Sequence, residues 1–469
     1  MTRLTLVDTA FFALESQTRP THAGVLMLFD PPQGEAGPDF ARRIADAFRT
    51  TAPVTPFDRR PVLGLGRLPH WVTVDDVDLD YHVRSIALPG PGTHQQLMEM
   101  LGHLYVALLD RSRPLWECYV IEGLENGQIA LFYKLHHALA DGISGARMLF
   151  GALSESPDDQ TISALWGPRK EARRRTRRRT RPARRSSPAE TLKLVGSQAQ
   201  TILGVGRRLA GIVPEAIGLR RGARALPFSA PRLASAAMRQ SPARSFAVFD
   251  LSLSGVKQVS EQAGCTINDV VLSVCDHAMQ RYLTEQGDPV ARPLIASMAV
   301  STRGAEDDKP SNAAALAQVE LGAPDATAAQ RLEQIIASTS TLKAGVRAMA
   351  PGVLELESVV FLGAAELREE LPVWRGVVPQ AANMLVSNIP GGPKDSLYLS
   401  GGRLTSLYAA PIVPPAHALN ITLASYADKL CFGVGAARNV IPGTARIAEL
   451  VLQSFDELAK SPAPRKSTI

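Results

Sequence analysis

Two adjacent histidines begin the most distinctive local pattern of the sequence, His136-His137-Ala138-Leu139-Ala140-Asp141-Gly142. The chain contains nine histidines in 469 residues, so this pattern rarely arises by chance. A neutral imidazole in an apolar pocket can accept a proton from a hydroxyl group, because its pKa lies near neutral pH. The carboxylate of Asp141 can orient the backbone or an arginine around it. The same residues can also be purely structural, with two histidines at the end of a strand and an Asp that caps a helix. The pattern alone therefore leaves a catalytic and a structural interpretation open.

The pattern lies where a predicted strand ends and a predicted helix begins. Residues 129–136 form an apolar run, Gly142 permits a tight turn, and Asp141 suits a helix N-cap. A serine hydrolase is the alternative for this stretch, because Gly142-Ile143-Ser144-Gly145 resembles part of a nucleophile elbow. The elbow needs a glycine two residues after the serine, and position 146 is Ala. Ser144 is therefore predicted to start the helix.

Two halves with alternating strand and helix patterns surround this motif. The first half runs from residue 21 to about residue 153, and the stretch 123–127 predicts a hairpin. The second half begins near residue 245. We expect strand-like runs at 25–29, 71–81, 116–121, 129–136, 246–251 and 295–300, helices at 95–109 and 267–283, and a β-rich tail at 404–434. The sequence therefore predicts an α/β protein of the α+β type, with domains at residues 1–155 and 244–469.

Residues 156–243 form a basic linker between the two predicted domains. Eleven basic residues and one acid occupy positions 169–185, whereas the formal charge of the whole chain is only +6. Apolar residues at helical spacing follow at positions 192–217. Two interpretations explain this pattern about equally well. The segment is either a solvated linker, or residues 169–224 contact an anionic bilayer. Nucleic acid is not expected as a partner, because no aromatic residues alternate with the arginines.

Composition and motif searches exclude several classes of protein. Hydrophobic residues make up 45% of the chain and charged residues 20%, as in folded globular proteins. The four cysteines are far apart and no metal-ligand cluster occurs, so we expect neither a disulfide framework nor a metal. No P-loop or dinucleotide-binding fingerprint suggests a cofactor. Because neither a signal peptide nor a long apolar run is present, we expect a cytoplasmic protein whose membrane contact is peripheral.

The histidine motif, followed by Ile143-Ser144-Gly145, resembles the HHxxxDG motif of the CoA-dependent acyltransferase superfamily. Within that superfamily, the chain resembles the bacterial wax ester synthase/diacylglycerol acyltransferase family over residues 4–458. Four further motifs occur in the order typical of this family: Pro114-Leu115-Trp116-Glu117, Asn268-Asp269-Val270-Val271-Leu272, Ser387-Asn388-Ile389-Pro390-Gly391 and Leu419-Asn420-Ile421-Thr422. The sequence departs from the family pattern at Pro310-Ser311-Asn312, at Gly392 and in the longer Arg-rich linker.

The resemblance implies two similar chloramphenicol-acetyltransferase-like domains with mixed sheets that meet at a central tunnel. It also implies an O-acyltransferase that moves a long-chain fatty acyl group from acyl-CoA to diacylglycerol, to a long-chain alcohol, or to both. Acyl-CoA is then a substrate, and no cofactor is expected. The protein is expected at the inner membrane leaflet or at a lipid-droplet surface. Two other functions fit the same sequence: acyl transfer or ester condensation from a carrier protein, and lipid binding without catalysis.

The resemblance also assigns roles to individual residues. His137 is expected to be the general base, and His136 to set the tautomer of His137. Asp141 is expected to point away from the substrate and to pair with an arginine of the other domain. Arg303, which follows a predicted strand, is our candidate for this partner, and an ordinary surface arginine is the alternative interpretation of that residue. Asn268 either donates to the developing oxyanion or braces the histidine loop. The remaining expected site residues are Gly142 and Asp269, as structural residues, and Ser387, Asn388, Pro390 and Asn420, in the tunnel wall.

Overall fold

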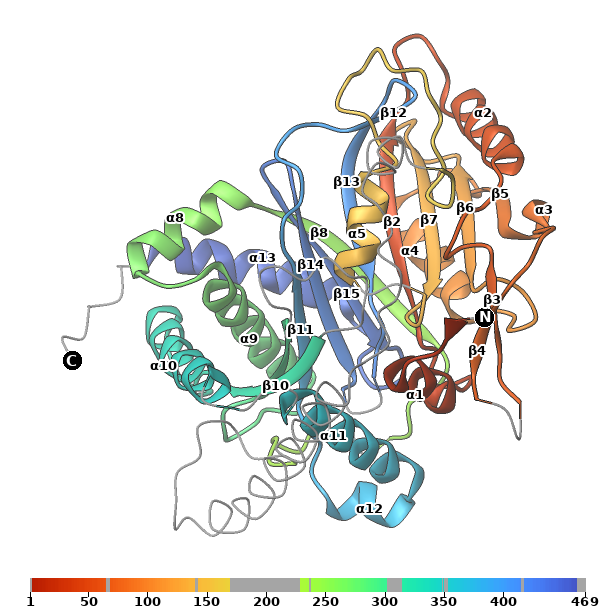
Figure 1. The fold of residues 1–469 in the computed structure, drawn as a ribbon. Helices are drawn as coiled ribbons and strands as arrows, with labels where there is room; N and C mark the ends of the chain where they lie inside the picture. Colours follow the sequence, from red (N-terminus) through yellow and green to blue (C-terminus); the bar gives the residue numbers. More distant parts are fainter. Residues whose placement is uncertain are drawn as a thin grey trace, which may run out of the picture.

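The described residues form two six-stranded mixed sheets in a computed structural model of the chain (Figure 1). The structure describes residues 2–64, 68–139, 142–168, 228–235, 238–301, 314–347, 349, 353–414 and 417–461. A small third sheet has the order β1 (Thr2–Arg3), β4 (His70–Thr73) and β3 (Arg59–Val62). The arrangement confirms the predicted α/β class.

The N-terminal sheet contains the strand that ends in the histidine motif. Its strand order is β12-β13-β2-β7-β6-β5. The strands are β2 (His22–Asp30), β5 (Val83–Ala87), β6 (Trp116–Glu122), β7 (Ile129–His136), β12 (Tyr398–Leu399) and β13 (Gly402–Ala410). Strands β6 and β7 form the predicted antiparallel hairpin, and every residue of β7 is buried. The end of β7 is therefore held firmly inside the molecule.

Strand β13 joins the two halves of the chain. It follows the second half in sequence, but it pairs antiparallel with β2 of the first half, with Leu404 opposite Phe29 and Ala410 opposite Gly24. Strand β13 also contacts β15 (Lys429–Ala437) of the other sheet. Gly433 of β15 lies so close to Ala409 that a Cβ atom would overlap the Ala409 carbonyl oxygen. The two sheets thus meet along β13 and β15.

The C-terminal sheet has the strand order β10-β9-β11-β14-β15-β8. The strands not yet defined are β8 (Arg244–Ser252), β9 (Ile295–Ser301), β10 (Ala314–Glu320), β11 (Met384–Ile389) and β14 (Leu419–Tyr426). Strand β11 runs parallel to both β9 and β14, whereas the other pairs are antiparallel. Helices α8 (Leu253–Ala263), α9 (Ile267–Glu285), α10 (Ala328–Arg347) and α13 (Thr444–Lys460) lie together on this half (Figure 1). These elements confirm the predicted strands at 246–251 and 295–300 and the helix at 267–283.

The helices of the N-terminal half are α1 (Leu6–Leu14), α2 (Gly37–Thr50), α3 (Leu79–His82), α4 (His94–Val106) and α5 (Gly142–Phe150). Thr5 begins α1 with a capping box that includes Asp8, and Thr93 begins α4 in the same way with Gln96. The run at 71–81 is only partly a strand. Strand β4 ends at Thr73, and the Asp78 side chain then caps the short helix α3.

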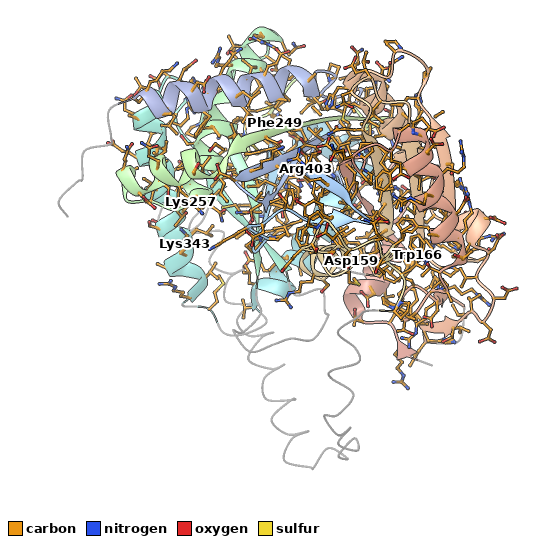
Figure 2. All side chains as sticks on the ribbon, turned by 90° about the horizontal axis from the view of Figure 1, so that it is seen from above. Asp159, Trp166, Phe249, Lys257, Lys343 and Arg403 are labelled. Atoms are coloured by element: carbon orange, nitrogen blue, oxygen red, sulfur yellow. The ribbon has the colours of Figure 1, made fainter. Side chains whose placement is uncertain are left out.

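Each sheet has its own large apolar core. Trp166 lies in the N-terminal core and Phe249 in the C-terminal core, and Figure 2 shows them in the two halves of the molecule. Trp116 and Leu115 of the Pro114-Leu115-Trp116-Glu117 motif are buried, as expected of core residues. Two further helices, α11 (Val353–Glu370) and α12 (Pro372–Val377), lie at the edge of the molecule beneath α1 (Figure 1). None of the helices that the structure describes is both long and apolar enough to cross a bilayer.

Candidate active site

His137 follows the last residue of β7 and is held by the segment that leads into β2. Its backbone N–H donates a hydrogen bond to the carbonyl oxygen of Thr21, at 3.0 Å. Its ring stacks on Phe11 of α1, with 4.7 Å between the ring centroids. The side chain is half-buried, whereas His136 is fully buried. The two histidines therefore have different environments, and His137 is the more accessible one.

His136 holds the turn that presents His137. Its Nδ1 atom accepts a hydrogen bond from the backbone N–H of Ala138, at 3.1 Å. The proton of the neutral ring therefore lies on Nε2, which is 2.9 Å from the Thr21 hydroxyl oxygen. The ring also stacks on Phe12, with centroids 4.4 Å apart. These contacts fix His136 in one tautomer and one orientation.

The polar chain continues from His136 to the N-terminal helix. The Thr21 hydroxyl donates to Oε1 of Glu15, at 3.0 Å. The other carboxylate oxygen of Glu15 accepts from Nε and Nη2 of Arg111, at 3.1 and 2.9 Å. The Glu15 side chain is only 1% exposed, so its charge is balanced inside the protein by Arg111. We call Arg111, Glu15, Thr21 and His136 the support chain.

Burial keeps His136 neutral. It lowers the pKa of His136 to about 3, with smaller contributions from the nearby His137 and Arg111. The charged form is disfavoured because the ring has lost its water and lies near the Arg111 guanidinium. A ring with this pKa keeps only its Nε2 proton at neutral pH and does not readily accept a second one. Its function in this geometry is to position the loop of His137.

Sequence reasoning did not find Glu15, Thr21, Arg111, Phe11 and Phe12. Their contacts with the motif depend on the pairing of β2 with β7, in which His22 lies opposite His136. No local spacing encodes that register. The one available signal was the capping box at Thr5 and Asp8, which predicts the helix that contains Phe11 and Phe12.

The Pro114-Leu115-Trp116-Glu117 motif supports β7 from the neighbouring strand. Glu117 of β6 lies opposite Lys134 of β7, and its carboxylate is 3.4 Å from the Lys134 ammonium nitrogen. Lys134 also donates to the carbonyl oxygens of Leu104 and Ala107 at the end of α4. Burial lowers the pKa of Lys134, and the charge of Glu117 opposes that shift. The motif thus ties helix α4 to the strand that ends in the histidines.

Gly142 brings the histidine motif against the Ser387-Asn388-Ile389-Pro390-Gly391 motif. It is the first residue of α5, and a Cβ atom at this position would lie 3.3 Å from Cδ1 of Ile389. The absence of a side chain at Gly142 lets α5 approach the end of β11 closely. Asp141, Arg303 and residues 310–312 lie outside the described residues, so the expected pair between Asp141 and Arg303 stays a prediction.

Asn268 and Asn388 are brought together although 120 residues separate them. Nδ2 of Asn388 donates to Oδ1 of Asn268, at 2.8 Å. Asn268 lies in the first turn of α9, and Asn388 lies in β11 one residue before Ile389. The contact therefore links the start of α9 to the strand that packs against the histidine motif. This geometry suits a bracing role for Asn268.

Asp269 stabilises the start of α9. Its carboxylate completes the capping box with Thr266, and Oδ1 accepts from the Thr339 hydroxyl of α10 at 2.7 Å. Lys343 of α10 lies 3.9 Å from the same oxygen. The carboxylate is thus occupied by contacts that join α9 to α10.

The residues expected in the tunnel wall have different environments. Ser387 is half-buried in β11, and Pro390, directly after the strand, is exposed. Asn420 is buried in β14, where its Nδ2 donates to the Ile412 carbonyl oxygen at 2.6 Å. Its Oδ1 accepts from the Thr422 hydroxyl at 3.1 Å. The hydrogen bonds of Asn420 therefore brace the segment after β13 and do not reach Asn268 or Asn388.

The departure from the family pattern at Gly392 has a steric reason. A Cβ atom at position 392 would overlap the backbone carbonyl of Ser425, and the Gly392 N–H donates to the Ser425 hydroxyl at 3.2 Å. Any larger residue would push this turn away from β14. The glycine thus allows the turn after β11 to pack on the neighbouring strand.

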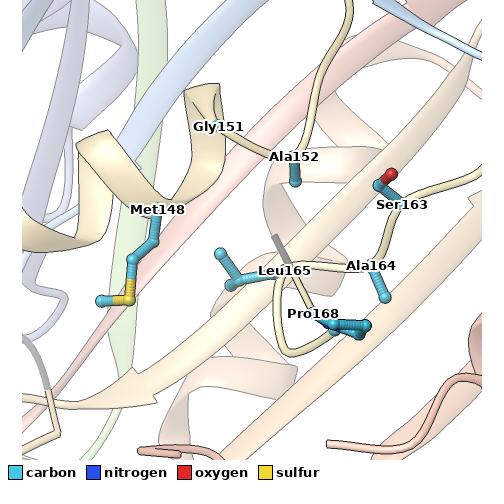
Figure 3. Close-up of a pocket in the computed structure, with 8 residues that line it drawn as sticks. Met148, Gly151, Ala152, Ser163, Ala164, Leu165 and Pro168 are labelled. Atoms are coloured by element: carbon cyan, nitrogen blue, oxygen red, sulfur yellow. The ribbon is translucent and has the colours of Figure 1, made fainter. Parts of the chain in front are cut away.

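A cavity of about 10 Å³ lies beside the C-terminal end of α5 (Figure 3). Its lining includes Met148 and Gly151 from the helix end and Leu165 and Pro168 from the segment before the linker. This volume is about that of one water molecule, too small for an acyl chain. The cavity is therefore a packing gap behind the motif helix.

Two family profiles match the chain. The wax ester synthase/diacylglycerol acyltransferase catalytic domain matches residues 4–271, and the WS/DGAT C-terminal domain matches residues 311–459. The first match contains the histidine motif and the support chain. The second contains the segment from β10 to α13, including Asn388 and Asn420.

Proteins of similar sequence match over nearly their whole length. The chain is 35% identical over 463 residues to the Mycobacterium tuberculosis protein "Probable diacyglycerol O-acyltransferase Tgs4", covering 98% of this chain and 96% of that protein. It is 36% identical over 465 residues to "Probable diacyglycerol O-acyltransferase tgs2" of the same species, covering 97% and 98%.

Solved structures share the fold. The wax ester synthase/diacylglycerol acyltransferase from Marinobacter aquaeolei VT8 matches with a TM-score of 0.73 and 30% identity, over 97% of this chain and 98% of that chain. The first condensation domain of the calcium-dependent antibiotic synthetase matches with a TM-score of 0.59 and 15% identity, over 100% and 97%. The second likeness concerns the fold alone. Together they confirm the predicted fold class.

Proposed function

The chain belongs to the wax ester synthase/diacylglycerol acyltransferase family, and on that premise we propose that it transfers a long-chain fatty acyl group from acyl-CoA to a lipid hydroxyl. The acceptor is diacylglycerol, a long-chain alcohol, or both. The chain is thus an O-acyltransferase that makes triacylglycerol or wax ester. The observation that supports this function most is the placement of His137 at the end of a buried strand, on a loop that His136 and Thr21 hold in place.

His137 is the proposed general base. It removes the proton from the acceptor hydroxyl while that oxygen attacks the thioester carbonyl carbon of acyl-CoA. The new C–O bond forms, the C–S bond breaks, and the His137 imidazolium then protonates the departing CoA thiolate. Base catalysis of this kind contributes roughly 10² to 10⁴ in rate. The imidazole supplies both proton transfers, so the proposed reaction needs no metal or cofactor.

The different environments of the two histidines support this assignment. His136 has a pKa of about 3 and uses both ring nitrogens in fixed contacts, so it is a poor base. His137 is more accessible and is positioned through its backbone and by Phe11. We assign His136 as a positioning residue and His137 as the catalytic residue.

The residues around the histidine motif complete the proposed site. Asp141 is proposed to pair with Arg303 and so to stabilise the loop after His137. Asn268 is proposed to brace the loop through Asn388, and Ser387, Asn388 and Pro390 to border the acyl or acceptor path. The packing of Gly142 on Ile389 supports this assignment, because it places β11 beside the motif.

Peripheral contact with the cytoplasmic face of a membrane or with a lipid droplet is a further part of the proposal. The Arg-rich and amphipathic segment 169–224 supplies positive charge and an apolar face in sequence, and it lies outside the described residues. Flotation with anionic liposomes tests this role. Deletion of residues 169–224 should reduce recovery in the lipid fraction, and undiminished recovery would contradict it.

The decisive experiment measures CoA thiol release from palmitoyl-CoA with hexadecanol or dioleoylglycerol as acceptor. Thin-layer chromatography of the products identifies wax ester or triacylglycerol. Acceptor-dependent release should vanish in His137→Ala and persist in His103→Ala, which removes an exposed histidine of α4. Lipid binding by folded wild-type protein, with no thiol release for either acceptor, would contradict acyl transfer from CoA.

A further inference from the structure

Large apolar side chains are concentrated on the surface of α11 and α12. Among the described residues, eleven large hydrophobic side chains are exposed, and six of them lie between positions 360 and 377. They are Val360, Leu367, Leu371, Val373, Trp374 and Val377. We call this set the α11–α12 face. Exposed apolar residues scattered singly are common, but six of them on and between two consecutive helices indicate a surface that binds something.

The exposed side of α11 includes two large apolar residues, Val360 and Leu367. Val360 and Leu367 are seven residues apart and therefore lie on one side of α11, and Leu371 follows the helix directly. The buried side is formed by residues such as Phe361 and Ala365, which pack against Ala381. A helix that contacts only water would place charged residues on its outer side. Helix α11 therefore has exposed apolar residues in addition to its buried ones.

Helix α12 extends this surface and holds it rigidly. Val373 is 75% exposed, Val377 is 65% exposed and Trp374 is 44% exposed. The backbone carbonyl oxygens of Val377 and Val378 accept hydrogen bonds from the guanidinium groups of Arg232 and Arg368. These bonds fix the end of α12, so its exposed apolar side chains are presented on an ordered element.

Two arginines lie at α12, because Arg232 donates to the Val377 carbonyl oxygen and Arg375 belongs to the helix. Arg232 and Arg239 are exposed and Arg375 is half-exposed. Near the C-terminal end of α11, Glu366 and Glu370 both pair with Arg19, Glu370 also lies 3.9 Å from Arg239, and Glu369 pairs with Arg368, so these three carboxylates share three arginines. An apolar centre with an arginine rim and an exposed Trp matches the acyl and phosphate layers of a phospholipid surface.

The α11–α12 face is connected to the histidine loop. Arg19, which pairs with Glu366 and Glu370 of α11, lies two residues before Thr21. Thr21 in turn contacts both histidines of the motif. In the view of Figure 1, α11 and α12 lie below α1, the helix that contains Phe11 and Phe12. A lipid surface on this side would lie near the segment that holds the catalytic loop.

We propose that the α11–α12 face docks the protein onto a phospholipid surface from which the lipid acceptor is taken. This inference rests on the proposed function, since it identifies the surface that supplies the acceptor to the same site. Docking places Val373, Trp374 and Val377 among the acyl chains and the arginine rim at the phosphate groups. It is separate from the contact proposed for residues 169–224.

The test is sedimentation of the full-length chain with vesicles of phosphatidylcholine and phosphatidylglycerol that contain dioleoylglycerol, at 0.5 M NaCl. High salt screens the Arg-rich segment, so apolar docking dominates the binding. The variant is the double substitution Val373→Glu and Val377→Glu. The control is Leu452→Glu, which places one such charge on an exposed apolar site of α13. We expect the double variant to lose at least about tenfold in partition coefficient and the control to bind like the wild type.

A second assay separates docking from catalysis. Thiol release from butyryl-CoA with hexanol needs no lipid surface, so the double variant should match the wild type. If the wild type lacks this activity, the proposed function is contradicted. The vesicle assay still tests docking by itself, because it measures binding and not catalysis. Unchanged vesicle binding by the double variant would overturn the docking proposal. Failure of the wild type to bind vesicles would also overturn it. If the wild type does not bind vesicles but forms a dimer that the double substitution dissociates, the face is a dimer interface and the docking proposal is wrong.

Discussion

The hydroxyl oxygen of Thr21 lies 2.9 Å from Nε2 of His136, and the carbonyl oxygen of the same threonine accepts the backbone N–H of His137. Thr21, which directly precedes β2, therefore contacts both histidines of the motif. The two contacts use different groups of Thr21, so substitution of the side chain can remove one contact and keep the other.

Thr21→Val should lower kcat by about tenfold while the KM for acyl-CoA stays close to that of the wild type. Valine has nearly the shape of threonine, and it leaves the Nε2 proton of His136 and the Glu15 carboxylate without the hydroxyl between them. The loss of a buried hydrogen bond should also cost about 1–3 kcal/mol in the free energy of unfolding. Steady-state kinetics and urea denaturation measure the two effects. Thr21→Ser restores the hydroxyl and should recover most of the activity; a fully active Thr21→Val enzyme would refute the support role.

His137→Ala and His136→Gln should differ in kind. His137→Ala should lower kcat by roughly 10² to 10⁴ with little change in melting temperature, because it removes a half-buried catalytic base. His136→Gln should lower the melting temperature and reduce kcat less, because it disturbs a buried ring that Ala138 and Thr21 contact. Thermal denaturation and thiol-release assays on both variants distinguish the two roles. A larger loss of kcat in stable His136→Gln than in His137→Ala would reverse the assignment.

Local patterns predicted the elements that present the motif. An apolar run and a Gly-rich connection were sufficient for β7 and its hairpin with β6, because both depend on neighbouring residues. The family resemblance, and not the spacing of apolar residues, identified His137 as the base. The support chain was not predicted, since Thr21 and His136 are 115 residues apart and meet only through the register of β2 and β7.

Strand β13 shows the same limit at the level of the fold. Its residues form part of the predicted β-rich tail, but they pair with β2 of the first half. An alternating apolar pattern indicates that a strand has a buried face, and it does not identify the neighbouring strand. The contact between Asn268 and Asn388 could not be predicted from spacing either. Asn is common at the start of a helix and beside a turn, so neither residue indicates that it has a distant partner.

The Asn268 and Asn388 pair should show coupling in a double-mutant cycle. Each single substitution to Ala removes one partner of the 2.8 Å hydrogen bond, and the double substitution removes both. We expect a coupling of about 1 kcal/mol in the free energy of unfolding. If Asn268 only braces the loop, Asn268→Ala and Asn388→Ala should reduce kcat by similar factors. Strictly additive changes in stability would show that the contact contributes nothing.

The stability of the protein should fall on acidification because of buried neutral histidines. Burial lowers the pKa of His417 to about 3, whereas an unfolded histidine titrates near 6.5. Between these pH values the unfolded state binds more protons than the folded state, so the free energy of unfolding decreases as the pH falls. Protonation of the unfolded His417 lowers the free energy of unfolding by about 2 kcal/mol between pH 7 and pH 5.

His417→Gln isolates this contribution, because His417 contacts the Ser297 hydroxyl far from the histidine motif in sequence and glutamine does not titrate. Urea denaturation of the wild type and the variant at pH 7 and pH 5 measures the difference in slope. We expect the variant to lose about 2 kcal/mol less than the wild type over this range, with any loss of packing appearing equally at both pH values. Equal pH dependence of the two proteins would mean that His417 is already protonated in the folded state at pH 5.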